Sequence, residues 1–151
     1  EIASQFKKET ILLIGPVSSD VKKEIEFLKK FENILVLGCI SYEELPIYID
    51  FFDIAIIPVK KNLLTNAMNM SKAYIYASMN KPIISTNLES FSLYKNEISL
   101  VNNNKEFIDT MKNILNGQIE QKNLEKVAKE NNWDNKVNKI IEIIKESITE
   151  K

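Results

Sequence analysis

The sequence predicts an α/β fold, a Rossmann-like three-layer parallel sheet with helices on both faces. Short apolar runs typical of buried strands alternate with amphipathic helical segments along the chain. Residues 53–86 hold a strand, a polar loop, a helix and a second strand, which is the crossover unit that builds parallel sheets. A chain of 151 residues suits one domain with a substantial core. We therefore predict a single domain over residues 1–151.

The composition restricts the classes of function. Hydrophobic residues make up 44% of the chain and charged residues 27%, as in an ordinary soluble globular protein. The 20 basic and 21 acidic residues give a net charge of -1, so we expect no nucleic-acid partner. No apolar run approaches the roughly 20 residues that a membrane-spanning helix requires. The single cysteine, Cys39, fits a reducing compartment, and we expect a cytoplasmic location.

The absence of histidine limits the chemistry further. It removes the commonest general base and the commonest metal ligand. With one cysteine and no histidine, no zinc site is expected. We expect neither a metal nor a cofactor, and no residue is identified as catalytic. Because the chain begins at Glu1 without methionine and shows no signal-peptide pattern, we expect it to be a piece of a longer protein.

The first part of the chain predicts two strands with a helix between them. Residues 1–9 carry apolar residues at helical spacing and are expected to end a helix. The apolar run at residues 10–14 ends at a Gly-Pro pair, which predicts a buried strand. N-cap candidates at residues 18–20 predict a helix through about Phe31. The apolar run at residues 33–37 predicts the second strand.

The crossover follows a second predicted helix, which a capping-box spacing places after residues 41–44. We predict the third strand at residues 53–58, a polar loop at 59–69, a helix beginning near Asn69, and the fourth strand at 82–85. In parallel sheets, ligands bind just beyond the carboxyl ends of the strands. The loop follows a strand at that edge, so a ligand site is expected there.

The last third is predicted to be mostly helical. A turn or short helix at residues 88–94 leads to a fifth strand at 98–101 and a helix at 105–115. Residues 118–151 are expected to be helical with an interruption near Trp133, which we expect to anchor the last helix. That helix carries an apolar stripe that needs a partner surface, formed by Val137, Ile140, Ile141, Ile144 and Ile148.

Four segments and a dipeptide carry a resemblance to a known family. They are LLIGP, NILVLG, SYEELPIYIDFFDIAIIPV and KPIIST, followed by Trp133-Asp134 near the end of the chain. Together they resemble the C-terminal, nucleotide-sugar-binding domain of a GT-B glycosyltransferase of the large retaining family 4 and its group 1 relatives. One branch of that family has a loop of the form N-x-L-T-x-A-x-x-x-x-K. This chain matches that loop in order at Asn62, Leu64, Thr65, Ala67 and Lys72.

The resemblance implies that the chain is the donor-binding half of a glycosyltransferase that transfers a sugar to an acceptor without a metal. The expected partners are a nucleotide-diphosphate sugar donor and a missing N-terminal acceptor domain, and the fragment alone is expected to be inactive. A departing nucleoside diphosphate gathers negative charge, which lysines and the N–H groups of a helix N-terminus stabilise. The candidate donor-binding residues are Lys61, Asn62, Thr65, Asn69, Met70 and Lys72.

The chain departs from the family pattern on the crossover helix. Relatives carry a glutamate three residues after the matched lysine, where it holds the ribose hydroxyls of the donor, and this position is Ile75 here. Asn80 replaces the glycine that is usual before the Lys-Pro pair. The alternative hypothesis is a degenerate glycosyltransferase-like domain that has lost donor recognition and acts as a binding or oligomerisation module. A generic nucleotide-binding α/β domain, such as a sugar epimerase, explains the strand pattern but not the loop matches.

Two further expectations follow from the resemblance. Relatives begin with an additional central strand that is not visible in this sequence, and an exposed apolar sheet edge favours a homo-oligomer. Many relatives make cell-envelope polysaccharides, so the parent protein is compatible with peripheral association with a membrane.

Overall fold

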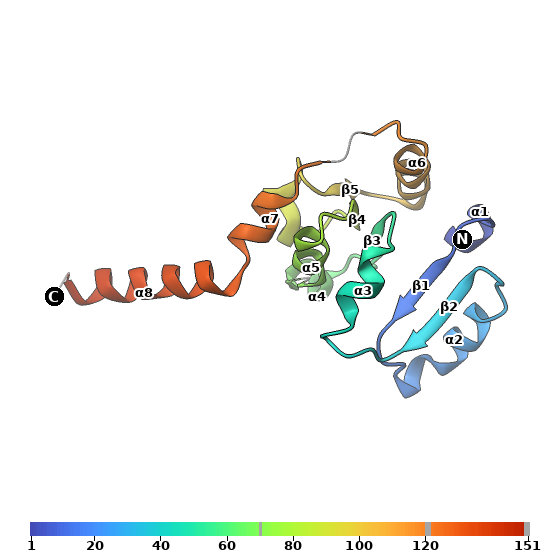
Figure 1. The fold of residues 1–151 in the computed structure, drawn as a ribbon, viewed down its shortest axis with the longest axis horizontal. Helices are drawn as coiled ribbons and strands as arrows, with labels where there is room; N and C mark the ends of the chain where they lie inside the picture. The colour runs from blue at the N-terminus through green and yellow to red at the C-terminus, as the bar shows by residue number, and fades with distance from the viewer. Residues whose placement is uncertain (70, 120–121, 150–151) are drawn as a thin grey trace. The chain divides into compact units, whose positions relative to one another are not determined.

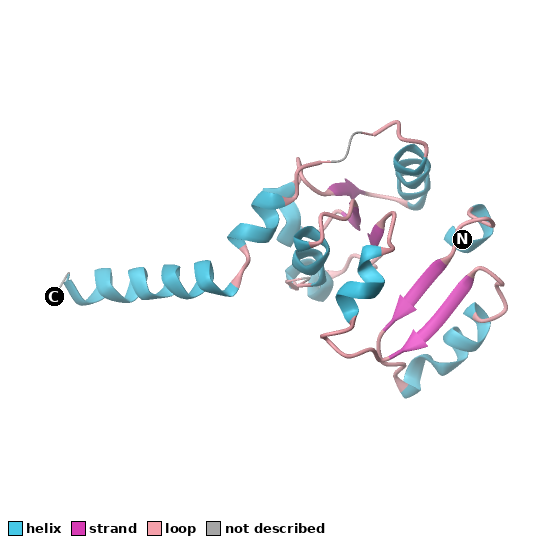
Figure 2. Cartoon of the chain, in the orientation of Figure 1, coloured by secondary structure: helices cyan, strands magenta, loops and turns pink. Residues whose placement is uncertain are grey.

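Parallel strands alternate with helices throughout the computed structural model, which describes residues 1–69, 71–119 and 122–149 (Figure 1, Figure 2). The strands of the described residues form two sheets, β1-β2 and β3-β4-β5. The chain divides into two compact units, Glu1–Tyr48 and Ile49–Lys151, and each sheet belongs to one unit. The α/β class with parallel, helix-flanked open sheets is therefore confirmed.

The first unit is built around the parallel pair β1 and β2. Ile11 pairs with Ile34 and Leu13 with Val36, and the Gly15 N–H donates to the Gly38 carbonyl at 2.8 Å. Both glycines have positive φ (142° and 75°), a backbone conformation that side-chain-bearing residues rarely adopt. The elements of this unit are α1 (Ile2–Gln5), β1 (Ile11–Ile14), the 3-10 turn η1 (Ser19–Val21), α2 (Lys22–Leu28) and β2 (Ile34–Gly38).

One asparagine ties the beginning of this unit together. Asn33 Nδ2 donates to the Ala3 carbonyl at 3.0 Å and to the Phe6 carbonyl at 2.7 Å. These carbonyls lie in and just after α1, whose last orphan acceptors need partners. The residue before β2 thus holds the first helix, and the side chains of Ala3 and Phe6 are both buried.

The capping box predicted at residues 41–44 forms in part, because the Glu44 carboxylate bonds the Ser41 hydroxyl, and the helix begins after it. Ser41 Oγ donates to Glu44 Oε2 at 2.9 Å and accepts from the Glu44 N–H at 3.2 Å. Helix α3 runs over Leu45–Asp50, with Pro46 in its first turn, where a missing N–H removes no intrahelical bond. The division between the two units falls within this helix.

The second unit contains the larger sheet, in the order β3-β4-β5. All its strands are parallel: Ala55 pairs with Ile83, and Ser85 with Leu100. Its elements are β3 (Ala55–Ile57), α4 (Leu63–Ala67), α5 (Lys72–Ser78), β4 (Ile83–Thr86), the 3-10 helix η2 (Glu89–Tyr94), β5 (Ser99–Val101), α6 (Asn104–Leu115), α7 (Glu125–Glu130) and α8 (Trp133–Thr149).

Helices cover both faces of this sheet because successive strand residues point to opposite sides. Ile83 belongs to the core cluster that includes Ala73 and Ala77 of α5 and Val127 of α7. Ile84, the next residue, is fully buried but lies outside that cluster, and α6 packs against β4 and β5. The buried residues of α6 are Phe107, Ile108 and Met111. Figure 1 shows α5 and α6 on either side of the strands.

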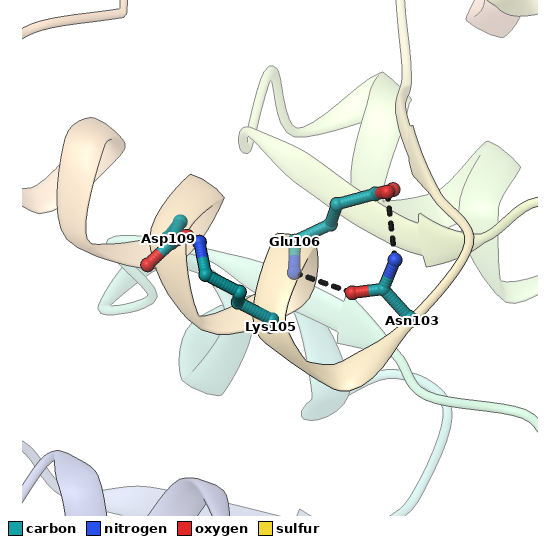
Figure 3. A network of polar contacts seen from close by, with 4 residues as sticks. All are labelled: Asn103, Lys105, Glu106 and Asp109. Atoms are coloured by element: carbon teal, nitrogen blue, oxygen red, sulfur yellow. Dashed lines mark hydrogen bonds and ion pairs between the residues drawn. The ribbon is translucent and has the colours of Figure 1, made fainter.

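Helix α6 closes its own N-terminus with charged and polar side chains (Figure 3). Asn103 Oδ1 accepts from the Glu106 N–H at 2.9 Å, and Asn103 Nδ2 donates to Glu106 Oε1 at 2.7 Å. Glu106 Oε2 also accepts from the Asn102 N–H at 2.8 Å, a bond that lowers the pKa of the Glu106 carboxyl. One turn along, Lys105 pairs with Asp109 at 2.6 Å. The polar and charged groups at this helix start therefore have partners within the segment itself.

The last helix, α8, leaves its apolar stripe exposed. Trp133, the first residue of α8, is 82% exposed, so its ring is not packed against the core and the expectation that it anchors this helix is wrong. The predicted stripe is present and partly exposed, at Val137, Ile140, Ile141, Ile144 and Ile148. None of the described helices is long and apolar enough to span a bilayer.

The crossover differs from its prediction in two places. Residues 59–69 were predicted as loop, but α4 occupies Leu63–Ala67 within them, because Asn62 caps this helix. The crossover helix α5 begins at Lys72, not near Asn69. The predicted strands all occur, each within two residues of its expected start, and α6 ends before Gly117, whose φ of 66° closes the helix.

Candidate functional site

The candidate site lies at the carboxyl edge of the β3-β4-β5 sheet, where the segment after β3 meets the segment after β4. Asn66 of α4 provides the direct link, because its Oδ1 accepts from the Glu89 N–H at 3.0 Å. Glu89 begins η2, which follows β4, and α4 packs against η2. Residues 60–69 are thus held at the edge where parallel sheets bind ligands.

Asn62 and Thr65 form a reciprocal cap at the start of α4. The Thr65 N–H donates to Asn62 Oδ1 at 2.9 Å, and the Asn62 N–H donates to Thr65 Oγ1 at 2.9 Å. The Thr65 hydroxyl also donates to the Lys60 carbonyl at 2.7 Å. This is a capping box with threonine at the third helical position in place of glutamate. Two of the predicted donor-binding residues are therefore brought together, and their hydrogen bonds shape the turn.

The residues before α5 are held by a tyrosine. Asn69 Oδ1 accepts from the Tyr74 hydroxyl at 2.7 Å, across the start of the helix. Burial raises the pKa of Tyr74 above its ordinary value of 10.0. On the ring of Tyr74, Lys136 Nζ of α8 lies 4.8 Å from the centroid, within cation–π distance. One face of Tyr74 is therefore occupied, which leaves less of the ring for stacking on a base.

The cations of the segment have no carboxylate to neutralise them. Between residues 59 and 72 there are three lysines, Lys60, Lys61 and Lys72, and no acidic residue. All three are exposed, and none has a salt-bridge partner among the described residues. The segment carries a formal charge of +3, which favours an anionic ligand.

Lys72 is the first residue of α5, and the N-terminus of this helix attracts an anion less strongly than predicted. The Ser71 side chain makes no capping bond, and the helix has only seven residues. A short helix has fewer aligned peptide dipoles to attract an anion. The lysine charges, rather than the helix N-terminus, therefore dominate the electrostatics here. Met70, also predicted to bind the donor, lies outside the described residues.

Ile75 occupies the position where relatives are expected to hold the ribose. It lies one turn after Lys72, and residues three apart share a helix face. Its side chain is half-buried, while the inward positions of α5 are Ala73 and Ala77. An isoleucine offers no hydrogen-bond acceptor in its side chain.

Sequence reasoning missed three contacts that build this site. Asn66 matched no position of the loop motif, and its bond to Glu89 joins residues 23 apart in sequence. The Asn69–Tyr74 bond had a weak signal, an amide placed five residues before a tyrosine. The contact between Lys136 and Tyr74 had none, since it depends on how α8 begins.

Comparison with known proteins gives one partial relationship. No family model matches the chain. Over 92 residues the chain is 29% identical to a Bacillus subtilis (strain 168) protein provisionally named teichuronic acid biosynthesis glycosyltransferase TuaH. The matched segment covers 61% of this chain but only 23% of the relative, so the chain spans less than a quarter of that protein in the match. The fold is Rossmann-like α/β, and this match supports a glycosyltransferase-like relationship.

Proposed function

We propose that this chain is the donor-binding part of a glycosyltransferase and holds the diphosphate of a nucleotide sugar at residues 60–72. The nucleotide-sugar donor, an acceptor domain elsewhere in the parent protein and transfer without a metal all belong to this proposal. Lys72 and Lys61 contact the phosphates. Asn62 and Thr65 hold the turn that carries these lysines.

The observation that carries the proposal is the unbalanced charge of residues 60–72, whose described part is hydrogen-bonded at the ligand-binding edge. Internal hydrogen bonds fix the backbone around Asn62, and Asn66 ties it to the segment after β4. The lysines, by contrast, have no partner among the described residues. A preorganised backbone with unpaired cations suits the charge that develops on a leaving diphosphate. The relationship to a glycosyltransferase points to the same chemistry.

Titration of the full chain with UDP, GDP and ADP by calorimetry tests this proposal. We expect one of the three to bind, and Lys72→Ala to weaken it about tenfold through the loss of a charge-assisted contact. Lys139→Ala is the matched control, because it removes an exposed lysine of α8 and leaves the site intact. If no nucleotide binds the folded chain, or if both variants weaken binding equally, the proposal is wrong.

Ile75→Glu supplies a second test at the same site. It restores a carboxylate one turn from Lys72, where two oxygens can accept from ribose hydroxyls. We expect tighter binding of the preferred nucleoside diphosphate and no change for inorganic pyrophosphate, which lacks the ribose. Equal changes for both ligands would contradict a ribose contact.

Ile75 also favours a second function, a glycosyltransferase-like binding or oligomerisation module without donor recognition. In that case nucleotides fail to bind both the natural chain and the Ile75→Glu variant, while the chain forms a defined oligomer in sedimentation velocity. The two functions therefore predict opposite results in the calorimetric titration.

A further inference from the structure

One carboxylate lies beside the candidate donor site, after the end of β4. Glu89 is the first residue of η2, the 3-10 helix that follows β4. It is the only acidic residue between Asp53 and Glu97, a stretch that contains β3, α4, α5 and β4. The segments that follow β3 and β4 thus bring several lysines and one carboxylate to the edge of the sheet where ligands bind.

The backbone of Glu89 is fixed from two directions. Its N–H donates to Asn66 Oδ1 of α4 at 3.0 Å, which joins the segment after β4 to the segment after β3. Leu88 and Phe91, on either side of it in sequence, are fully buried in the core cluster. The Phe91 N–H donates to the Leu88 carbonyl at 3.0 Å. The Glu89 side chain therefore starts from a backbone that is held next to residues 60–69 without help from the carboxylate.

The carboxylate of Glu89 is accessible to a ligand. The residue is exposed, and its side chain forms no hydrogen bond or ion pair with the residues that the structure describes. In particular, none of the described lysines of residues 60–72 lies within salt-bridge distance of it. An anion bound by these lysines is therefore not forced into contact with the Glu89 carboxylate, which would repel it.

A nucleotide sugar offers groups that suit both parts of this edge. Its diphosphate is anionic and matches the lysines, whereas its sugar ring carries neutral hydroxyl groups on neighbouring carbons. A carboxylate accepts hydrogen bonds through two oxygens, so it can bind two hydroxyl groups at once. Hydrogen bonds to an ionised acceptor are roughly twice as strong as those between neutral groups. A glutamate is therefore a better partner for a sugar than an uncharged side chain of the same size.

We propose that Glu89 binds two hydroxyl groups of the donor's sugar while the lysines of residues 60–72 hold the diphosphate. This inference rests on the proposed donor site and adds the residue that recognises the transferred sugar. It restricts the donor to sugars with free hydroxyl groups on adjacent carbons. The bond from the Glu89 N–H to Asn66 keeps the two parts of the site at a fixed separation.

Titration with nucleotides and their glucose conjugates separates the sugar contact from the diphosphate contact. The full chain and its Glu89→Gln variant are titrated by calorimetry with UDP, GDP and ADP, and with UDP-glucose, GDP-glucose and ADP-glucose. We expect Glu89→Gln to weaken the glucose conjugate of the preferred nucleotide about tenfold, because charge-assisted hydrogen bonds are lost. The free nucleotide should bind this variant equally well or more tightly. Glu130→Gln, with the same change in net charge at the exposed end of α7, should leave the ratio of the two affinities unchanged.

Glu89→Asp tests the position of the carboxylate rather than its charge. The shorter side chain keeps the charge but withdraws it by one methylene group, so we expect weaker binding of the glucose conjugate and unchanged binding of the free nucleotide. If a nucleotide binds but its glucose conjugate does not, or if Glu89→Gln weakens both ligands equally or neither, the role of Glu89 is wrong while the diphosphate site stands. If no nucleotide binds, the donor site itself is wrong, and this inference fails with it.

Discussion

Two segments at the carboxyl edge of the same sheet differ in whether their charged side chains are paired. Around residues 102–109, after β5, Glu106 accepts bonds from Asn102 and Asn103, and Lys105 pairs with Asp109 (Figure 3). In residues 60–72, after β3, the amide side chains accept hydrogen bonds from Thr65, Glu89 and Tyr74. The lysines of this segment have no salt-bridge partner among the described residues. Each segment contains an asparagine-capped helix.

This difference separates a structural helix start from a candidate binding site. At α6 the carboxylate of Glu106 already occupies the place where an anion would bind a helix N-terminus. At α4 the cap is made of neutral groups, so the positive potential of the lysines is not cancelled locally. An anionic ligand therefore gains more at residues 60–72 than at residues 102–109.

Removing the unpaired cations should have the largest effect. We expect the triple variant Lys60→Gln, Lys61→Gln, Lys72→Gln to weaken nucleoside diphosphate binding roughly 100-fold, because several charge-assisted contacts are lost together. The matched triple variant Lys105→Gln, Lys112→Gln, Lys139→Gln has the same change in net charge. Calorimetry should show no more than a small change for it, and an equal loss would mean that net charge alone attracts the nucleotide.

Removing the two caps should affect stability unequally. Asn103→Ala should lower the free energy of unfolding by about 1 kcal/mol, since it uncaps α6, whose inward face is buried in the core. Asn62→Ala should lower it by about 0.5 kcal/mol, because α4 has five residues and none is buried. Denaturant unfolding measures both values. A larger loss for Asn62→Ala would show that α4 supports the core more than its exposure indicates.

Tyr74→Phe tests whether the turn before α5 is held from outside. The change removes the bond to Asn69 but keeps the ring beneath Lys136, so we expect a loss of about 0.5 kcal/mol in stability. Amide hydrogen exchange should rise at Asn69 and Ser71 and stay constant at residues 103–106. Unchanged exchange at Asn69 would contradict the role given to this bond.

The acid cap of α6 should produce a small pH dependence. Because folding lowers the pKa of Glu106 below its ordinary 4.5, the stability that it contributes is present above that pH and lost as the pH falls through the lowered value. In the Glu106→Gln variant, the midpoint temperature of thermal unfolding should fall less steeply as the pH is lowered from roughly 6 to 3. Other carboxyls with lowered pKa values, such as Asp109, keep part of the slope. An identical slope in both proteins would contradict this assignment.

The strands were predictable because their apolar runs are short and end at glycine, proline or polar residues. The runs at 10–14 and 33–37 became β1 and β2 with shifts of one residue. Helix α4 was missed because threonine, not glutamate, completes its capping box. In addition, six of the eleven residues at 59–69 are polar, as is typical of a loop. Trp133 was misplaced since its exposure depends on the turn between α7 and α8, which no local pattern encodes.

The site was predictable in composition but not in its connections. The sequence shows the lysines of residues 60–72 and the absence of acids among them. The contacts to other elements join Asn66 to Glu89 and Lys136 of α8 to Tyr74, and these depend on tertiary packing. Asn80 lies between a feature that the sequence shows and one that depends on tertiary packing. Its φ of 52° requires a residue that tolerates the left-handed region, which asparagine does better than most.

The contact between Lys136 and Tyr74 connects helix α8 to the candidate site. The helix has 17 residues, about 25 Å at 1.5 Å per residue, and Lys136 lies in its first turn. The exposed stripe includes Ile140, one turn after Lys136, so a molecule that packs on it would bind next to the residue that covers Tyr74.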